Sequence, residues 1–97
     1  MRLNSFQIDH IKTHAATFFS ESAKVYLFGS RVDDNKRGGD IDLYVETEIK
    51  NKIFHRKIKM LTALMMSLGE QKIDLVINNF TDDQEIYKVA KMEGVLL

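Results

Sequence analysis

The sequence predicts an α+β fold with two layers, in which a small mixed sheet has helices packed on it. Three observations support this prediction. Apolar residues recur at helical spacing in three separate segments. Between these segments lie short stretches in which apolar residues form a run or alternate with polar ones, as they do in strands. With 97 residues, the chain suffices for a single domain, residues 1–97, with a thin core.

The helices are predicted from apolar stripes and from residues that end or cap a helix. Residues 5–19 and 51–68 form the first two helices, and Gly69 follows the second. Thr81 followed by Gln84 resembles a capping box that opens a third helix. The apolar positions of these helices are Ile8, Ile11, Ala15 and Phe18 in the first, Phe54, Ile58, Leu61, Met65 and Leu68 in the second, and Ile86, Val89 and Ala90 in the third.

The strands are predicted at residues 25–28, 40–46 and 72–77. The first is an apolar run that Gly29 ends, and a polar loop that begins with a helical turn follows it as far as residue 39. The second alternates, so that Ile41, Leu43 and Val45 share one buried face while Asp40, Asp42, Tyr44 and Glu46 share the other face. The element order is therefore helix, strand, strand, helix, strand, helix.

Composition narrows the class of protein. Fourteen basic residues balance fourteen acidic ones, whereas an extended nucleic-acid surface needs a basic excess. Cysteine is absent, which is typical of a reducing compartment. No apolar run approaches the roughly 18 residues of a membrane span, and the N-terminus lacks the pattern of a signal peptide. We therefore expect a cytoplasmic protein with no membrane contact.

Asp40 and Asp42 are the first candidate site residues. Side chains two residues apart on a strand project from the same face, so these carboxylates lie side by side. Such a pair repels by about 4 kcal/mol at roughly 4 Å in an effective dielectric near 20. A divalent cation such as Mg²⁺ or Mn²⁺ is the simplest counter-charge. The competing interpretation is a pair of solvated acids at the start of a strand.

Asp74 is the third candidate, because it is the one acid in an otherwise apolar strand. If this strand lies beside the Asp40 strand, the three carboxylates converge on one face. Three convergent carboxylates can hold two metal ions, as in enzymes of phosphoryl transfer. A charge that protects a sheet edge from aggregation is the alternative interpretation of Asp74.

Gly29, Ser30 and Arg31 follow the first strand directly. Glycine lets the backbone approach a ligand closely, and a serine that opens a helical turn can bind phosphate through its hydroxyl and nearby N–H groups. Arg31 can add a charge-assisted contact to phosphate or form a surface salt bridge. A plain turn at the end of the strand is the alternative for Gly29 and Ser30.

Gly29-Ser30, nine further residues and then Asp40-Ile41-Asp42-Leu43 form a pattern that resembles the polymerase-beta-like nucleotidyltransferases, and most of all their minimal (MNT) group. The resemblance covers nearly the whole chain and implies that family's fold. Two departures are visible. The spacing is one residue shorter than is usual in the MNT pattern, and Gly39 stands where serine often precedes the first aspartate.

The resemblance implies a reaction and roles for these residues. The Gly29-Ser30 turn binds the triphosphate of a nucleotide, with ATP as the expected substrate. Asp40 and Asp42 bind two Mg²⁺ ions, and Asp74 binds the ion that activates the acceptor. A hydroxyl of the acceptor then attacks the α-phosphorus and displaces pyrophosphate.

The resemblance also bears on the partner. MNT proteins are often paired with a small helical HEPN-type toxin, which they can adenylylate on a tyrosine and so act as antitoxins. This is the leading hypothesis for the chain. Two alternatives stay open: a partner-binding antitoxin module without catalysis, and a small-molecule nucleotidyltransferase whose separate subunit binds the substrate. The residues leave the acceptor, the base preference and the oligomeric state undetermined.

Overall fold

A computed structural model describes residues 3–32, 39–69 and 71–97, with the backbone alone for Ser30. Its elements are α1 (Ser5–Phe18), β1 (Lys24–Phe28), the 3₁₀ turn η1 (Gly29–Val32), β2 (Ile41–Glu46), α2 (Ile53–Leu68), β3 (Ile73–Asn78), α3 (Glu85–Glu93) and β4 (Val95–Leu96). The predicted helices and strands are all present, with boundaries shifted by a few residues. Residues 33–38 of the predicted loop lie outside the described residues.

The strands form one mixed sheet in the order β3-β2-β1-β4. β1 is antiparallel to β2 and to β4, whereas β2 and β3 are parallel neighbours. The parallel pair requires a crossover, and α2 supplies it. The structure thus confirms the predicted α+β class with a mixed sheet.

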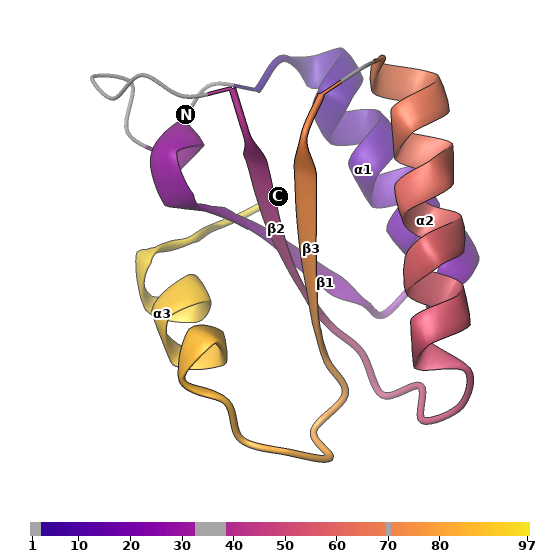
Figure 1. The fold of residues 1–97 in the computed structure, drawn as a ribbon, viewed down its shortest axis with the longest axis vertical. Helices are drawn as coiled ribbons and strands as arrows, with labels where there is room; N and C mark the ends of the chain where they lie inside the picture. The colour runs from indigo at the N-terminus through magenta and orange to yellow at the C-terminus, as the bar shows by residue number, and fades with distance from the viewer. Residues whose placement is uncertain (1–2, 33–38, 70) are drawn as a thin grey trace.

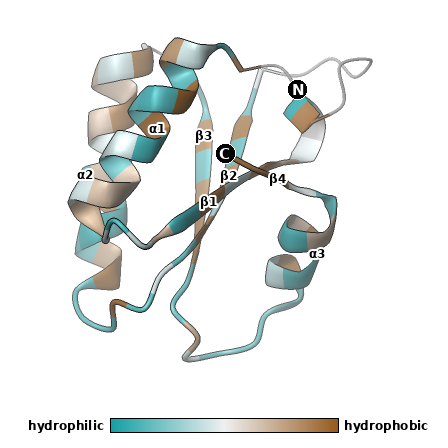
Figure 2. Ribbon diagram, turned by 180° about the vertical axis from the view of Figure 1, so that it is seen from behind, coloured by the Kyte–Doolittle hydropathy of each residue, from teal (hydrophilic) through white to brown (hydrophobic). Residues whose placement is uncertain are grey.

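The helices lie on both faces of the sheet (Figure 1). α1 and α2 pack side by side on one face, and α3 covers part of the other. The main core lies between the sheet and α1 and α2, and β2 contributes three completely buried side chains to it: Ile41, Leu43 and Val45. Figure 2 shows the apolar residues along the strands between the helices, with hydrophilic residues over most of the loops.

α1 begins as its sequence predicts. The Asn4 side chain accepts a hydrogen bond from the Gln7 N–H at 2.8 Å, and the Gln7 side chain accepts one from the Asn4 N–H at 3.0 Å. This capping box satisfies N–H groups that have no partner inside the helix. Ile11 and Ala15 of the predicted stripe are buried. Within the described residues, no helix combines the length and the apolar character that crossing a membrane requires.

The apolar stripe predicted for α2 coincides only partly with the side of the helix that is buried. Phe54, Ile58 and Met65 are exposed by 75%, 44% and 55%, whereas Met60 and Leu64 are completely buried. α2 has apolar residues on two sides, so spacing alone does not decide which side faces the sheet. The packing against α1 and β3 selects the side that carries Met60 and Leu64.

β2 differs from its prediction on its second face. Tyr44 and Glu46, expected on an open face, are 1% and 8% exposed. α3 folds back over this part of the sheet, where Tyr44 packs in a second small core with Phe28, Tyr87 and Ala90. The return of α3 follows from chain topology and is invisible in the alternation of β2.

The predicted start of α3 is wrong. The helix begins at Glu85, and its N-cap, Gln84, makes no side-chain capping hydrogen bond. The Thr81 hydroxyl donates instead to the Asn79 side chain at 2.6 Å, within a loop. Tyr87 and Ala90 are the buried residues of α3, and of the predicted set Ile86 and Val89 remain partly exposed.

Candidate active site

Asp42 and Asp74 are direct neighbours across the parallel strands β2 and β3. Their carboxyl groups interact at close range on the sheet face opposite the main core. Burial, followed by the hydrogen bond and negative charge of Asp74, raises the pKa of Asp42. β3 therefore lies beside β2, as the prediction for Asp74 required, and Asp74 meets Asp42 on one sheet face.

The Asp42–Asp74 pair destabilises the folded protein when no cation is bound. Two like charges at contact distance repel more strongly where the surroundings exclude water, and Asp42 is partly buried. Carboxylate oxygens held together in this way are the ligands that Mg²⁺ and Mn²⁺ prefer. Asp42 and Asp74 thus form a donor pair that fits a divalent cation.

Asp40 takes a different position from the other two acids. It precedes β2, and its half-exposed carboxylate lies 3.7 Å from the ammonium group of Lys72. Its charge nevertheless contributes to the raised pKa of Asp42. Among the described residues, no three acidic or histidine side chains are grouped so that they could hold a metal ion. Asp40 would have to leave Lys72 to join the Asp42–Asp74 pair.

Gly29 lies directly against Asp42. Its φ is +77°, and a Cβ built on it would overlap the Asp42 carboxylate. The register explains the contact, because Phe28 pairs with Asp42 in the antiparallel β1–β2 ladder and Gly29 is the next residue. Both the backbone conformation and the lack of a side chain are needed here. The turn that follows β1 therefore begins at the acid pair.

Arg31 connects three segments at this edge of the sheet. Its guanidinium donates to the Gly39 carbonyl oxygen at 3.0 Å and to the Gln71 side-chain oxygen at 3.1 Å. It therefore holds the residues before β2 and β3 close to η1. The predicted contact of the Ser30 hydroxyl with phosphate lies outside what the structure describes.

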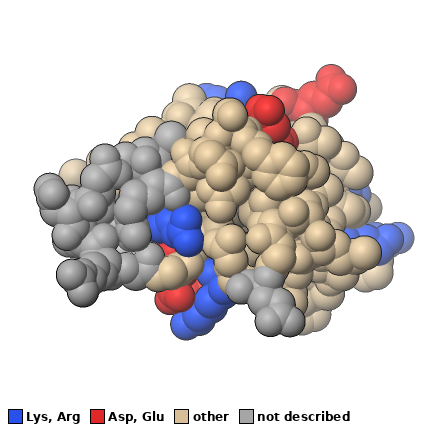
Figure 3. Space-filling model, turned by 90° about the horizontal axis from the view of Figure 1, so that it is seen from above, with Lys and Arg blue, Asp and Glu red and all other residues tan. Residues whose placement is uncertain are grey.

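Charge at this end of the molecule is mixed in sign. Figure 3 views the molecule from this end, and among the residues it colours, acidic and basic side chains form small adjacent groups. This distribution agrees with the balanced composition of the chain. The balanced composition favours a small charged ligand over a long polyanion, which binds to a broad basic surface.

Lys72 was missed in the sequence. Lys72 belongs to a segment far from Asp40 and Asp42 in the chain, so their neighbours in sequence do not reveal it as a counter-charge. Its spacing is a usable signal, because Lys72 directly precedes β3 and is two residues from Asp74, which favours the same side of the extended chain.

A mixed sheet that brings paired carboxylates from adjacent strands against a glycine turn is an arrangement suited to phosphoryl transfer. The comparison with known families agrees with this class. The chain belongs to the family described as Polymerase beta, Nucleotidyltransferase, whose sequence model matches residues 10–97. No curated protein matched the chain. The resemblance in the Gly29-Ser30 and Asp40-Ile41-Asp42 motifs is thereby confirmed at the level of the family.

Proposed function

We propose that this nucleotidyltransferase transfers AMP from ATP to a hydroxyl group of an acceptor, with Mg²⁺ or Mn²⁺ bound by Asp40, Asp42 and Asp74. The observation that carries the proposal is the contact of the Asp42–Asp74 pair with the Gly29 turn. This contact supports the proposal because it joins two carboxylates that suit a cation to a backbone turn that suits phosphate.

The acids have distinct tasks under this proposal. Asp42 and Asp74 would hold the cation, because their carboxyl groups already lie together. Asp40, which is paired with Lys72, would supply a third carboxylate. When bound, divalent ions neutralise charge on the phosphates and lower the pKa of a coordinated hydroxyl. Asp74 is exposed, so it can meet an acceptor that comes from solvent or from another protein.

The turn positions the nucleotide. Gly29 lets the backbone of the turn lie directly against Asp42, and the N–H groups of η1 can donate to phosphate oxygens there, with the Ser30 hydroxyl as a further proposed donor. Arg31 keeps the ends of the adjoining segments in place through Gly39 and Gln71. Its guanidinium would also supply positive charge near the phosphates.

For the acceptor, we propose a tyrosine of a small helical HEPN-type partner, which the chain would neutralise as an antitoxin. The exposure of Asp74 supports an acceptor that arrives from outside the domain, such as a side chain of another protein. Transfer to a small molecule bound by a separate subunit is the alternative enzymatic outcome. Binding to the partner without transfer is the non-enzymatic one.

The test incubates the protein with α-labelled ATP, Mg²⁺ and the product of the adjacent gene. Label should pass to the partner, and Asp42→Asn should abolish transfer. Asp9→Asn, a change at an exposed position of α1, is the matched control and should retain full activity. Equal labelling by wild type and Asp42→Asn would disprove the proposal. Neutralisation of the partner by both variants without label would establish the binding module.

A further inference from the structure

The apolar stripe on α2 lies largely outside the core. Its residues follow one another at alternating intervals of four and three: Phe54, Ile58, Leu61, Met65 and Leu68. Phe54, Ile58 and Met65 are exposed, and the two leucines are half-buried. This alternation is the heptad spacing by which one helix packs along another. We call these five residues the α2 seam.

α1 lies on the side of α2 away from the seam. Arg56 donates to a backbone carbonyl oxygen of α1 at 2.9 Å, and Ser67 is hydrogen-bonded to His14 of α1 at 2.8 Å. Ile58 and Met65 are each two residues from one of these contacts, so they lie about 200° away from them around the helix. α2 packs against β3, an edge strand of the sheet. The seam therefore has an exposed side on which a further helix can lie, opposite α1.

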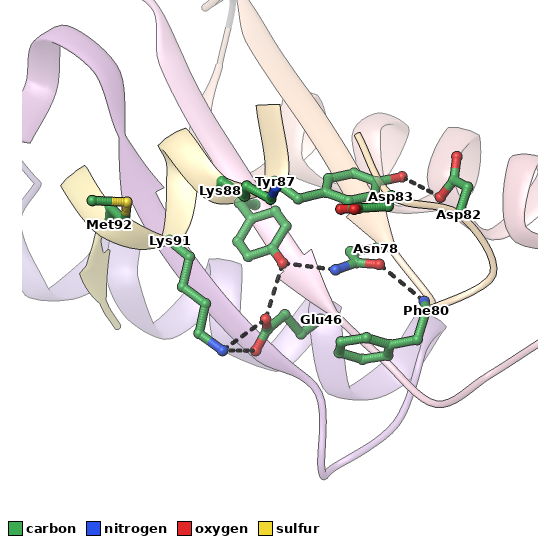
Figure 4. A pocket seen from close by; sticks show the side chains of 10 residues that line it. Glu46, Asn78, Phe80, Asp82, Asp83, Tyr87, Lys88, Lys91 and Met92 are labelled. Carbon is green, nitrogen blue, oxygen red and sulfur yellow. Dashed lines mark hydrogen bonds and ion pairs between the residues drawn. The ribbon is translucent and has the colours of Figure 1, made fainter. Parts of the chain in front are cut away.

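The face of the sheet under α3 differs from the seam, because its polar and aromatic groups contact one another. Around a cavity of about 460 Å³ there, the Tyr44 hydroxyl donates to Glu46 and accepts from Asn78, both at 2.9 Å (Figure 4). The Phe80 ring, at the rim of this cavity, has the Lys50 ammonium group 5.9 Å from its centre. The exposed and polar groups of that face thus have partners within the chain.

The charges of α2 indicate the chemistry of a partner. Residues 49–69 contain no acid, although the whole chain is neutral, and they contain five basic residues: Lys50, Lys52, Arg56, Lys57 and Lys59. Lys57 directly precedes Ile58, and His55 directly follows Phe54, so both flank the seam. Among the described residues, no carboxylate forms an ion pair with Lys57. Flanking charges select the partner in helix pairs, so a partner helix should carry acids there.

Two other occupants fit the seam less well. A second copy of the chain offers no acid on α2 to meet these basic residues. A membrane surface would meet the polar side chains of His55, Lys59 and Thr62, which are exposed beside the seam. A helix in a membrane interface has a broad apolar face, whereas a narrow stripe is typical of a contact between two helices.

We propose that the α2 seam is the docking site for a helix of a partner protein, with apolar residues at heptad spacing and acidic residues beside them. The partner helix lies along α2 on the side opposite α1, so α2 is packed between two helices. The proposal rests on the proposed function for the existence of a helical partner. The seam itself is defined without reference to the acid pair.

The test uses a synthetic peptide of about three heptads, with Ile and Leu at the seam positions and Glu beside them. Because its glutamates repel one another, the peptide stays monomeric at neutral pH. It carries a fluorescent label, and the anisotropy of this label is followed as the full chain is added. Wild type should bind the peptide in a saturable manner.

Phe54→Ser should weaken this binding about tenfold, because it removes an aromatic residue of the seam. Met66→Ser is the matched control, since Met66 is 84% exposed on the same helix but lies off the seam. It should bind the peptide as wild type does. Both residues are exposed, so both variants should unfold close to the temperature of wild type.

A second pair of variants tests the charges. Lys57→Glu should weaken binding of the Glu peptide and should strengthen binding of an otherwise identical peptide with Lys in place of Glu. Lys59→Glu makes the same change of charge at a position that does not flank the seam, and should have a smaller effect. Equal effects of the two variants would contradict pairing beside the seam.

Four further results would overturn the inference. One is the absence of peptide binding up to the solubility limit of the peptide, and another is equal binding by wild type and Phe54→Ser. Binding of wild type to vesicles of phosphatidylserine and phosphatidylcholine, but not to the peptide, would assign the seam to a membrane. Sedimentation of wild type as a dimer that Phe54→Ser dissociates would assign it to a second copy.

The proposed function can fail separately from the docking site. Transfer of label from ATP depends on Asp42 and is measured without the peptide. Peptide binding together with equal labelling by wild type and Asp42→Asn would disprove the proposed function and leave the docking site. Transfer that Asp42→Asn abolishes, in a protein that does not bind the peptide, would do the reverse.

Discussion

The Asp42 carboxylate occupies the space that a side chain on residue 29 would need. Gly29 therefore has two requirements, a positive φ and the absence of a Cβ, and both follow from the same turn at the end of β1. The turn and the acid pair form one structural unit. A substitution at Gly29 should therefore disturb Asp42, and a substitution at Asp42 should disturb the turn.

Three glycines allow the two requirements to be separated. Gly29→Ala should destabilise the protein by about 2–3 kcal/mol through strain and overlap, and should weaken Mg²⁺ binding by displacing Asp42. Gly69 also has a positive φ, +84°, but has open space around it, so Gly69→Ala should show the strain alone. Gly39→Ala meets neither problem and should be nearly neutral. Thermal unfolding with and without Mg²⁺ measures each variant.

Asp42→Asn should stabilise the metal-free protein at neutral pH while it abolishes transfer. The raised pKa of Asp42 means that the folded state favours the protonated carboxyl. The stability from this group is complete below the pKa of an unfolded aspartate, about 3.9, and is lost as pH rises through the higher folded pKa. Asn lacks this loss, so its advantage should grow with pH, because it carries no charge to be desolvated by burial or repelled by Asp74.

Unfolding in EDTA from acidic to neutral pH measures this difference, and Asp9→Asn serves as the exposed control. Mg²⁺ should then stabilise wild type and leave Asp42→Asn unaffected, because only a site that binds the ion is stabilised by it. An Asp42→Asn protein that is less stable than wild type at neutral pH would contradict the role assigned to charge repulsion.

Lys72→Met should strengthen Mg²⁺ binding. Lys72 lies 3.7 Å from Asp40 and competes with a cation for it. An exposed ion pair contributes about 0.2–1 kcal/mol, so its removal should lower the Kd of Mg²⁺ about 1.4- to 5-fold. Calorimetric titration gives this value, with the exposed Lys59→Met on α2 as a control of equal charge change. Weaker Mg²⁺ binding in Lys72→Met would show that Lys72 supports the site.

Tyr44→Phe should cost about 1–3 kcal/mol of stability. The change removes the hydroxyl that links Asn78 to Glu46 and leaves their buried polar groups without this partner. Tyr26→Phe, on the half-buried neighbouring position of β1, should change stability by less than about 0.5 kcal/mol. Chemical denaturation compares the two. Equal losses in both variants would mean that the chain of hydrogen bonds adds little.

Much of the fold could be predicted because its signals are local. The alternation in β2 places Asp42 opposite Ile41 and Leu43, and the same rule separates Asp74 from Ile73 and Leu75. The prediction failed for α2, where two apolar sides compete, and for Thr81, which caps no helix. In these cases the outcome depends on what the segment packs against, and local spacing does not contain that information.

At the site, the order of residues along the chain establishes which groups are present: a glycine turn after one strand, and aspartates among the apolar residues of two others. The packing of the strands sets which of these groups meet. The parallel pairing of β2 and β3 brings Asp42 and Asp74 together, directs Lys72 to Asp40, and leaves α3 to close a cavity over Glu46 and Asn78. The reason is physical: strand alternation sets the face of a residue within its own strand, whereas its neighbours across the sheet depend on strand order and register.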